Sequence, residues 1–95
     1  MSSKVTTIFT FKIESSFDKW AEIFDSEEAA KRHAEFDIKP LYRGVSKDDP
    51  HQVICIHQHP EGNVQKFLQS NSDWISTHSV VLSTMEKSVW TDSLQ

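Results

Sequence analysis

The sequence predicts an α+β fold: a ferredoxin-like βαββαβ antiparallel sheet with its helices on one face. Segments rich in β-branched and aromatic residues alternate with segments whose apolar residues recur at helical spacing. A turn at Lys47–Pro50 separates the two middle strand-like segments, which therefore form a hairpin. With 95 residues the chain is long enough for one core and too short for two, so we expect a single domain over residues 1–95.

The first part of the chain predicts one strand followed by two helical segments. Residues 4–13 (KVTTIFTFKI) are mainly β-branched and aromatic, which suits a strand. Ser15 and Asp18 suit the start of a helix, because their side chains accept hydrogen bonds from free backbone N–H groups. Asp25 with Glu28 predicts a second start in the same way. The apolar stripe of the first helix consists of Phe17, Trp20, Ala21 and Phe24.

The rest of the chain predicts three strands and a helical region. The strands are expected within residues 38–46, 51–59 and 81–91, with a helix at 63–70 before the last of them. Pro40 suits an edge strand, because proline donates no hydrogen bond to a neighbour. Asn71–Asp73 predicts the cap of a further helical piece that carries Trp74 and Ile75.

Both faces of the predicted sheet are apolar. Strand alternation places Phe9 and Phe11 on one face, and we expect the helices to cover it. The other face carries Ile8, Ile54 and Ile56, with threonine rather than charge between them. Such a face needs a second cover, and a symmetric copy of the same chain supplies one. We therefore expect a homodimer packed sheet to sheet, with these three isoleucines in the interface.

Composition limits the partners and the setting. Fourteen acidic against ten basic residues give a net charge of −4 with no basic run, which argues against nucleic acid. The apolar runs are too short for a membrane span, and no signal-peptide-like segment is present. Cys55 is the only cysteine and lies within an apolar strand, so we expect a buried, unreactive thiol and a cytoplasmic protein.

The segment FDKWAEIFD at residues 17–25 resembles the D-x-W-x-x-x-F-D segment of small dimeric α/β-barrel proteins related to the antibiotic-biosynthesis monooxygenases. Residues 42–57 look like the hairpin that follows it in those proteins, and residues 64–70 look like their second helix. The resemblance implies a dimer whose sheets close into a barrel, with a cavity between sheet and helices in each subunit. Asp37 and Ser79 stand where the family pattern has glycine, at turns that favour a left-handed backbone.

His57 and His59 are the candidate functional pair, because residues two apart on a strand project from one face. A metal needs at least a third ligand, and the sequence signals none, so we expect no metal. We expect instead a ligand pocket, with His57 deep and His59 at the mouth. The tentative pocket consists of His57, His59, Phe9, Phe11, Trp74 and His78.

No catalytic signature accompanies this pocket: the sequence has no Ser-His-Asp order, phosphate-binding glycine loop or paired carboxylates. The Asn–Trp–His set of haem-degrading relatives is also missing, and no cofactor is expected. The leading hypothesis is a protein that binds a small apolar or aromatic molecule. A cofactor-independent monooxygenase or isomerase, with His57 or His59 accepting a proton, is the alternative. A purely structural role applies if large side chains fill the cavity.

Overall fold

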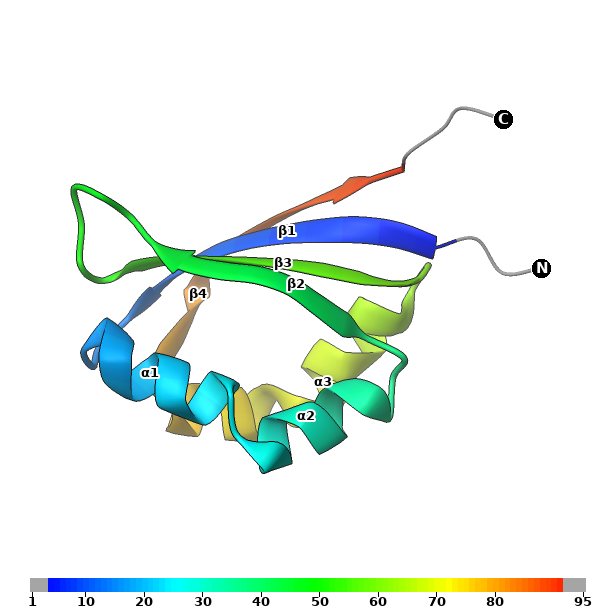
Figure 1. Ribbon diagram of the computed structural model, residues 1–95, viewed down its shortest axis with the longest axis horizontal. Helices are drawn as coiled ribbons and strands as arrows, with labels where there is room; N and C mark the ends of the chain where they lie inside the picture. Colours follow the sequence, from blue (N-terminus) through cyan, green and yellow to red (C-terminus); the bar gives the residue numbers. More distant parts are fainter. Residues whose placement is uncertain (1–3, 92–95) are drawn as a thin grey trace.

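The computed structural model describes residues 4–91 and has the predicted element order. The elements are β1 (Lys4–Ile13), α1 (Phe17–Phe24), α2 (Glu27–Ala34), β2 (Lys39–Val45), β3 (Gln52–Pro60), α3 (Asn63–Thr77) and β4 (Val80–Trp90). The four strands form one antiparallel sheet in the order β2-β3-β1-β4, and the helices lie on one face of it (Figure 1). This arrangement confirms the ferredoxin-like fold.

The helix starts differ by one residue from those the sequence predicts. Ser16 caps α1 by accepting a hydrogen bond from the Lys19 backbone N–H, and Ser26 caps α2 in the same way. The predicted cap at Ser15 is wrong, because its hydroxyl donates to the neighbouring Ser16 carbonyl instead. The predicted cap at Asp25 is also wrong, because its carboxylate is engaged by a guanidinium from β2.

Helix α3 runs unbroken through the point where the sequence predicts a new start at Asn71–Asp73. Asn71 is buried, and its Nδ2 donates to the Phe67 carbonyl one turn back, at 3.1 Å. Its amide therefore serves its own helix instead of capping a new one. Trp74 and Ile75 consequently follow on the same helix as Phe67. No helix within residues 4–91 is long and apolar enough to cross a membrane.

The two sheet faces are distinguished as predicted, and the helices cover the side that carries Phe9 and Phe11. Residues at alternate positions of β1 are buried while those between them, Ile8 included, are only half-buried. Helices α1 and α3 complete the core with Trp20 and Phe67. Ile54 and Ile56 lie with Ile8 on the uncovered outer face.

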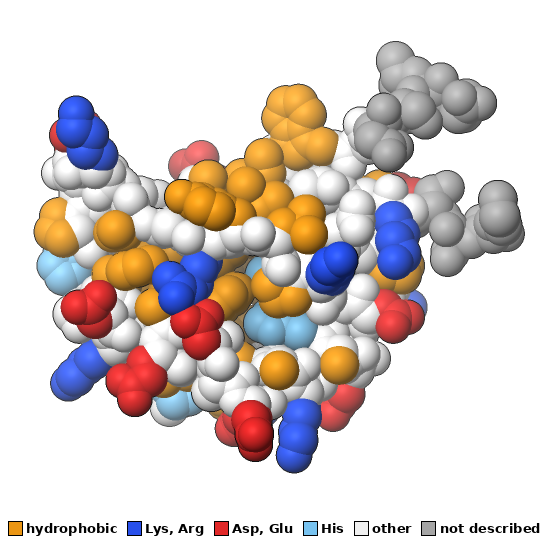
Figure 2. All heavy atoms as spheres, in the orientation of Figure 1, with side chains coloured by type: hydrophobic (Ala, Val, Ile, Leu, Met, Phe, Trp, Pro, Cys, Tyr) orange, Lys and Arg blue, Asp and Glu red, His pale blue; other side chains and the backbone are white. Residues whose placement is uncertain are grey.

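Strand β4 is irregular, and its last residues extend beyond the helices (Figure 1). Its register with β1 shifts between Thr10 and Lys12, where the Lys12 backbone N–H donates to the Thr84 hydroxyl at 2.9 Å. Such a bulge re-aims the side chains beside it. Near the end of the strand Val89 and Trp90 are more than half exposed. Figure 2 shows apolar side chains gathered along the sheet side of the molecule.

Two tight turns use a left-handed backbone without glycine. Asp37 follows α2 with a φ of 55°, and Ser79 follows α3 with a φ of 78°. These are the two positions at which the family pattern has glycine. The turns that the resemblance implies are therefore present, and each directs the chain from a helix back to the sheet.

Candidate functional site

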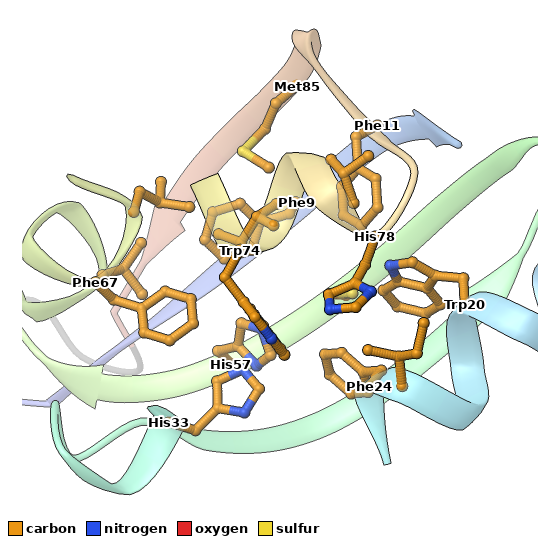
Figure 3. A pocket seen from close by; sticks show the side chains of 16 residues that line it. Phe9, Phe11, Trp20, Phe24, His33, His57, Phe67, Trp74, His78 and Met85 are labelled. Carbon is orange, nitrogen blue, oxygen red and sulfur yellow. The ribbon is translucent and has the colours of Figure 1, made fainter. Parts of the chain in front are cut away.

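A small aromatic pocket lies between the inner face of the sheet and the helices (Figures 2 and 3). Its volume is about 70 Å³. No Asp, Glu, Lys or Arg side chain from residues 4–91 lines it, and three histidines supply most of its polarity. Its aromatic wall consists of Phe9, Phe11, Trp20, Phe24, Phe67 and Trp74. The pocket is therefore suited to an apolar ring and not to an ion.

His57 is the central polar group of the pocket. Strand β3 directs it to the inner face, where it is only 6 % exposed. Its ring stacks on Phe24 at 5.8 Å between centroids and contacts Phe9 at 5.5 Å. Its Nδ1 atom is buried and has no hydrogen-bond partner among residues 4–91. A buried polar atom without a partner is costly, so this atom suggests a role in binding.

Burial keeps the His57 imidazole neutral. Desolvation lowers the pKa of His57 to about 3, and the nearby His33 and His59 act in the same direction, because a second positive charge would be repelled. At neutral pH the ring consequently offers one N–H donor and one nitrogen acceptor. It can orient a hydroxyl or a carbonyl, but it is a weak base for removing a proton.

His33 is a pocket residue that the sequence analysis did not assign. It lies on α2, is buried, and stacks on Phe67 with 5.0 Å between ring centroids. Its ring centroid is 5.2 Å from that of His57. Burial lowers the pKa of His33, and a hydrogen bond to the Ala29 backbone opposes this shift. His33 follows the buried Ala29 by four residues on α2, and this helical spacing is the signal that its side chain faces inward.

His59 does not line the pocket, contrary to the expectation that it lies at the mouth. Its Nδ1–H donates to the Pro60 carbonyl at 2.8 Å, and its Nε2 accepts from the Thr7 hydroxyl at 2.7 Å. It lies two residues beyond His57, about 6.6 Å farther along the strand. Val5 is the β1 residue opposite His59, and Thr7, which lies opposite His57, reaches the His59 ring diagonally and satisfies it. His59 therefore stabilises the pairing of β1 and β3.

The other expected residues meet in the pocket. Phe9 and Phe11 come from β1, while Trp74 and His78 come from the end of α3. Figure 3 shows Trp74 and His78 pointing into the space between the sheet and α1. Among residues 4–91, no three His, Cys, Asp or Glu side chains are placed to hold a metal ion together.

Cys55 also lines the pocket, on the floor that β3 provides. It is 2 % exposed, and burial raises the pKa of its thiol to about 12. The expectation that this residue is buried is confirmed. At neutral pH the side chain is a protonated thiol that packs as a small apolar group.

Comparison with protein-family models assigns the chain to a family. A family model described as a domain of unknown function, DUF3764, matches residues 4–92. The chain belongs to this family. No curated protein is significantly similar to this DUF3764 chain in sequence.

Solved structures similar to this DUF3764 protein share its fold at low sequence identity. A NIPSNAP family protein from Agrobacterium tumefaciens is 11% identical, with a TM-score of 0.65 over 98% of this chain and 89% of its own. SnoaB from Streptomyces nogalater, a cofactor-independent oxygenase, is 14% identical, with a TM-score of 0.57 over 99% and 97%. A putative antibiotic biosynthesis monooxygenase from Nitrosomonas europaea is 13% identical, with a TM-score of 0.54 over 95% and 90%. These matches show that the chain shares the fold of these proteins.

Proposed function

We propose that this protein binds a small, uncharged aromatic molecule in the pocket, where His57 orients it through one hydrogen bond. The observation that carries this proposal is the buried Nδ1 of His57, which has no hydrogen-bond partner among residues 4–91 and lies within a wall of aromatic rings. An apolar ring gains free energy by leaving water for this wall. A hydroxyl or carbonyl on the ring satisfies the imidazole at the same time.

The absence of charge from the lining supports an uncharged ligand. A carboxylate or phosphate would lose its hydration without meeting a cation among the described lining residues. A phenol-like molecule avoids this cost, because a neutral imidazole accepts its hydroxyl proton in a hydrogen bond. The ligand class is thus a single ring with one neutral polar substituent.

Phenol and toluene test this proposal, because they match in size and differ in the hydroxyl group. We expect phenol to bind at millimolar concentration and to shift the amide NMR signals of Phe9, Cys55 and His57. His57→Phe keeps a ring but removes the hydrogen bond, so it should lower the preference for phenol over toluene about threefold to tenfold. The proposal is contradicted if neither compound causes a saturable shift, or if a folded His57→Phe variant prefers phenol over toluene as strongly as the wild type does.

A cofactor-independent monooxygenase or isomerase reaction in the same pocket is the alternative. The description of SnoaB as a cofactor-independent oxygenase favours it through fold likeness alone. Such chemistry needs a group that accepts a proton from the ligand. The lowered pKa of His57 makes this imidazole a weak acceptor, so binding is the better-supported function.

The protein acts as a homodimer joined through the outer face of the sheet. Ile8 pairs with Ile56, and Ile56 pairs in turn with Tyr42 on β2, so one apolar row crosses three strands. Tyr42 is 58 % exposed and its ring lies over Gly44, where an added β-carbon would meet the hydroxyl oxygen at 2.8 Å. A second copy covers this face without new sequence features. The lone Cys55 supports a cytoplasmic setting.

A further inference from the structure

We propose that Trp74 is a movable wall that limits the size of the ligand, and that Arg32 holds this wall closed. The inference rests on the proposed function, since it concerns the same pocket. Trp74 lies on α3 and lines the pocket while remaining partly exposed. Arg32 lies on α2 with its guanidinium carbon 4.6 Å from the centroid of the Trp74 ring.

The pocket is smaller than an aromatic ring, so a wall has to move slightly to admit one ring and much farther to admit two. Its volume is about 70 Å³. A cavity that holds benzene in another protein measures about 150 Å³. The sheet side chains on its floor, Phe9, Phe11 and Cys55, are at most 4 % exposed and cannot move without disturbing the core.

Phe24 and Trp74 are the two partly exposed rings of the aromatic wall, and Trp74 has fewer ring contacts than Phe24. Phe24 packs against Trp20, His33 and His57 with centroids 4.9–5.8 Å apart. The ring contacts of Trp74 within residues 4–91 are with His78, at 5.2 Å, and with the Arg32 cation. An outward rotation of Trp74 therefore breaks fewer contacts than a movement of Phe24 does.

Arg32 is itself held in place, so it can fix the indole. Its Nη1 donates to the Asn71 Oδ1 at 2.7 Å, and the buried Asn71 is bonded in turn to the Phe67 carbonyl. The Nε of Arg32 is buried without a hydrogen-bond partner in the described part of the chain. A cation over an indole attracts it electrostatically. A ligand that needs the open position has to overcome this attraction, which weakens its apparent binding.

The test compares 1-naphthol, which has two rings, with phenol, which has one, by NMR titration of each variant. In the wild-type protein we expect phenol to bind and 1-naphthol to bind more weakly. Trp74→Ala should raise the affinity for 1-naphthol relative to phenol about tenfold, and Trp74→Leu should act in the same direction with less loss of packing. Arg32→Met should raise this ratio about threefold, because it removes the cation and keeps the side-chain stem.

Two further variants separate this role from general destabilisation. Arg32→Lys retains a cation near the indole and should keep the ratio close to that of the wild type. Arg43→Met removes an arginine that pairs with Asp25 and packs over Phe17 outside the pocket, so its ratio should not change. If phenol binding depends on His57 but both Trp74 variants keep the wild-type ratio of 1-naphthol to phenol affinity, Trp74 does not limit ligand size. The proposed function is then still supported. Binding of neither compound by any of these proteins overturns both proposals.

Discussion

At the scale of single residues, the pocket contrasts two buried histidines that lie two positions apart on β3. His59 has both ring nitrogens hydrogen-bonded, one to Thr7 and one to the Pro60 carbonyl. His57 has none of these partners, and its Nδ1 is left without one in the described chain. A buried histidine whose nitrogens are hydrogen-bonded stabilises the fold, whereas a buried nitrogen without a partner lowers stability unless a ligand bonds to it. Thr7 makes this difference, because its hydroxyl bonds to the ring of His59 and not to that of His57.

The lowered pKa of His57 predicts acid sensitivity. Between pH 6.5 and about pH 3 the unfolded chain binds a proton at this histidine and the folded protein does not. Acidification through this window therefore favours unfolding, by up to about 1.4 kcal/mol per pH unit, and the lowered pKa of His33 acts in the same direction. His57→Phe should lose less stability than the wild type between pH 7 and pH 4.5, as measured by urea unfolding.

Phe24→Leu is the matched control for this measurement. It alters packing in the same pocket without removing a titratable group, so it should lower the free energy of unfolding similarly at both pH values. A His57→Phe protein that is folded and has the same pH dependence as the wild type would show that His57 is protonated in the folded state.

At the scale of helices and strands, the order and the faces were predictable and the exact ends were not. Period-two alternation in β1 and the helical stripe through Trp20 identify which sides are buried, since both follow from local geometry. The sequence predicts the cap of α2 at Asp25, one residue before Ser26, because aspartate and serine are equally good caps. Only the fold brings a guanidinium to Asp25.

The candidate site was predictable only in part for a related reason. Strand alternation leads to His57, and helix periodicity leads to Trp74. The pairing of Thr7 opposite His57, which brings the threonine within reach of His59, is a register between strands about fifty residues apart in sequence. Helical spacing from Ala29 indicates that His33 faces inward, but only the packing of α2 against α3 brings it into the pocket.

The backbone conformation of Ser79, at the end of α3, indicates that glycine at this position would stabilise the protein. Its φ of 78° lies in the left-handed region, which is unfavourable for a side chain with a β-carbon. Its backbone bonds to Ser76 and Glu14 do not require the hydroxyl. Ser79→Gly should raise the free energy of unfolding by about 0.5–1 kcal/mol, after the greater freedom of glycine in the unfolded chain is counted. Thermal or urea unfolding measures the change.

Ser70→Gly provides the opposite control for Ser79→Gly. Ser70 is exposed within α3, where the backbone is helical and glycine is unfavourable. This substitution should lower the free energy of unfolding by roughly 0.5 kcal/mol. Equal effects of the two substitutions would mean that the turn at Ser79 carries no backbone strain.

At the scale of the whole molecule, the sheet separates two apolar regions with different roles. The helices enclose the pocket on the inner face, and the outer face presents Ile8, Ile54 and Ile56 half-buried in the single chain. Trp90, on the outer-face side of β4 opposite Thr6, adds a large apolar side chain that is 57 % exposed. A face of this kind favours association, whereas the pocket lies on the other side of the sheet, beneath the helices.

The proposed homodimer predicts the effect of a substitution at Ile54. A sheet-to-sheet dimer with two-fold symmetry brings this side chain from each subunit into the interface, so Ile54→Asp buries two unpaired carboxylates there. We expect the free energy of dimerisation to weaken by at least a few kcal/mol. The protein should then be a monomer at micromolar concentration, as measured by light scattering. Gln65→Asp adds the same charge at an exposed position in the first turn of α3 and should remain dimeric. Circular dichroism checks that each variant is folded. A wild-type monomer at micromolar concentration, or a folded Ile54→Asp variant that stays dimeric, would show that the outer face of the sheet is not the interface.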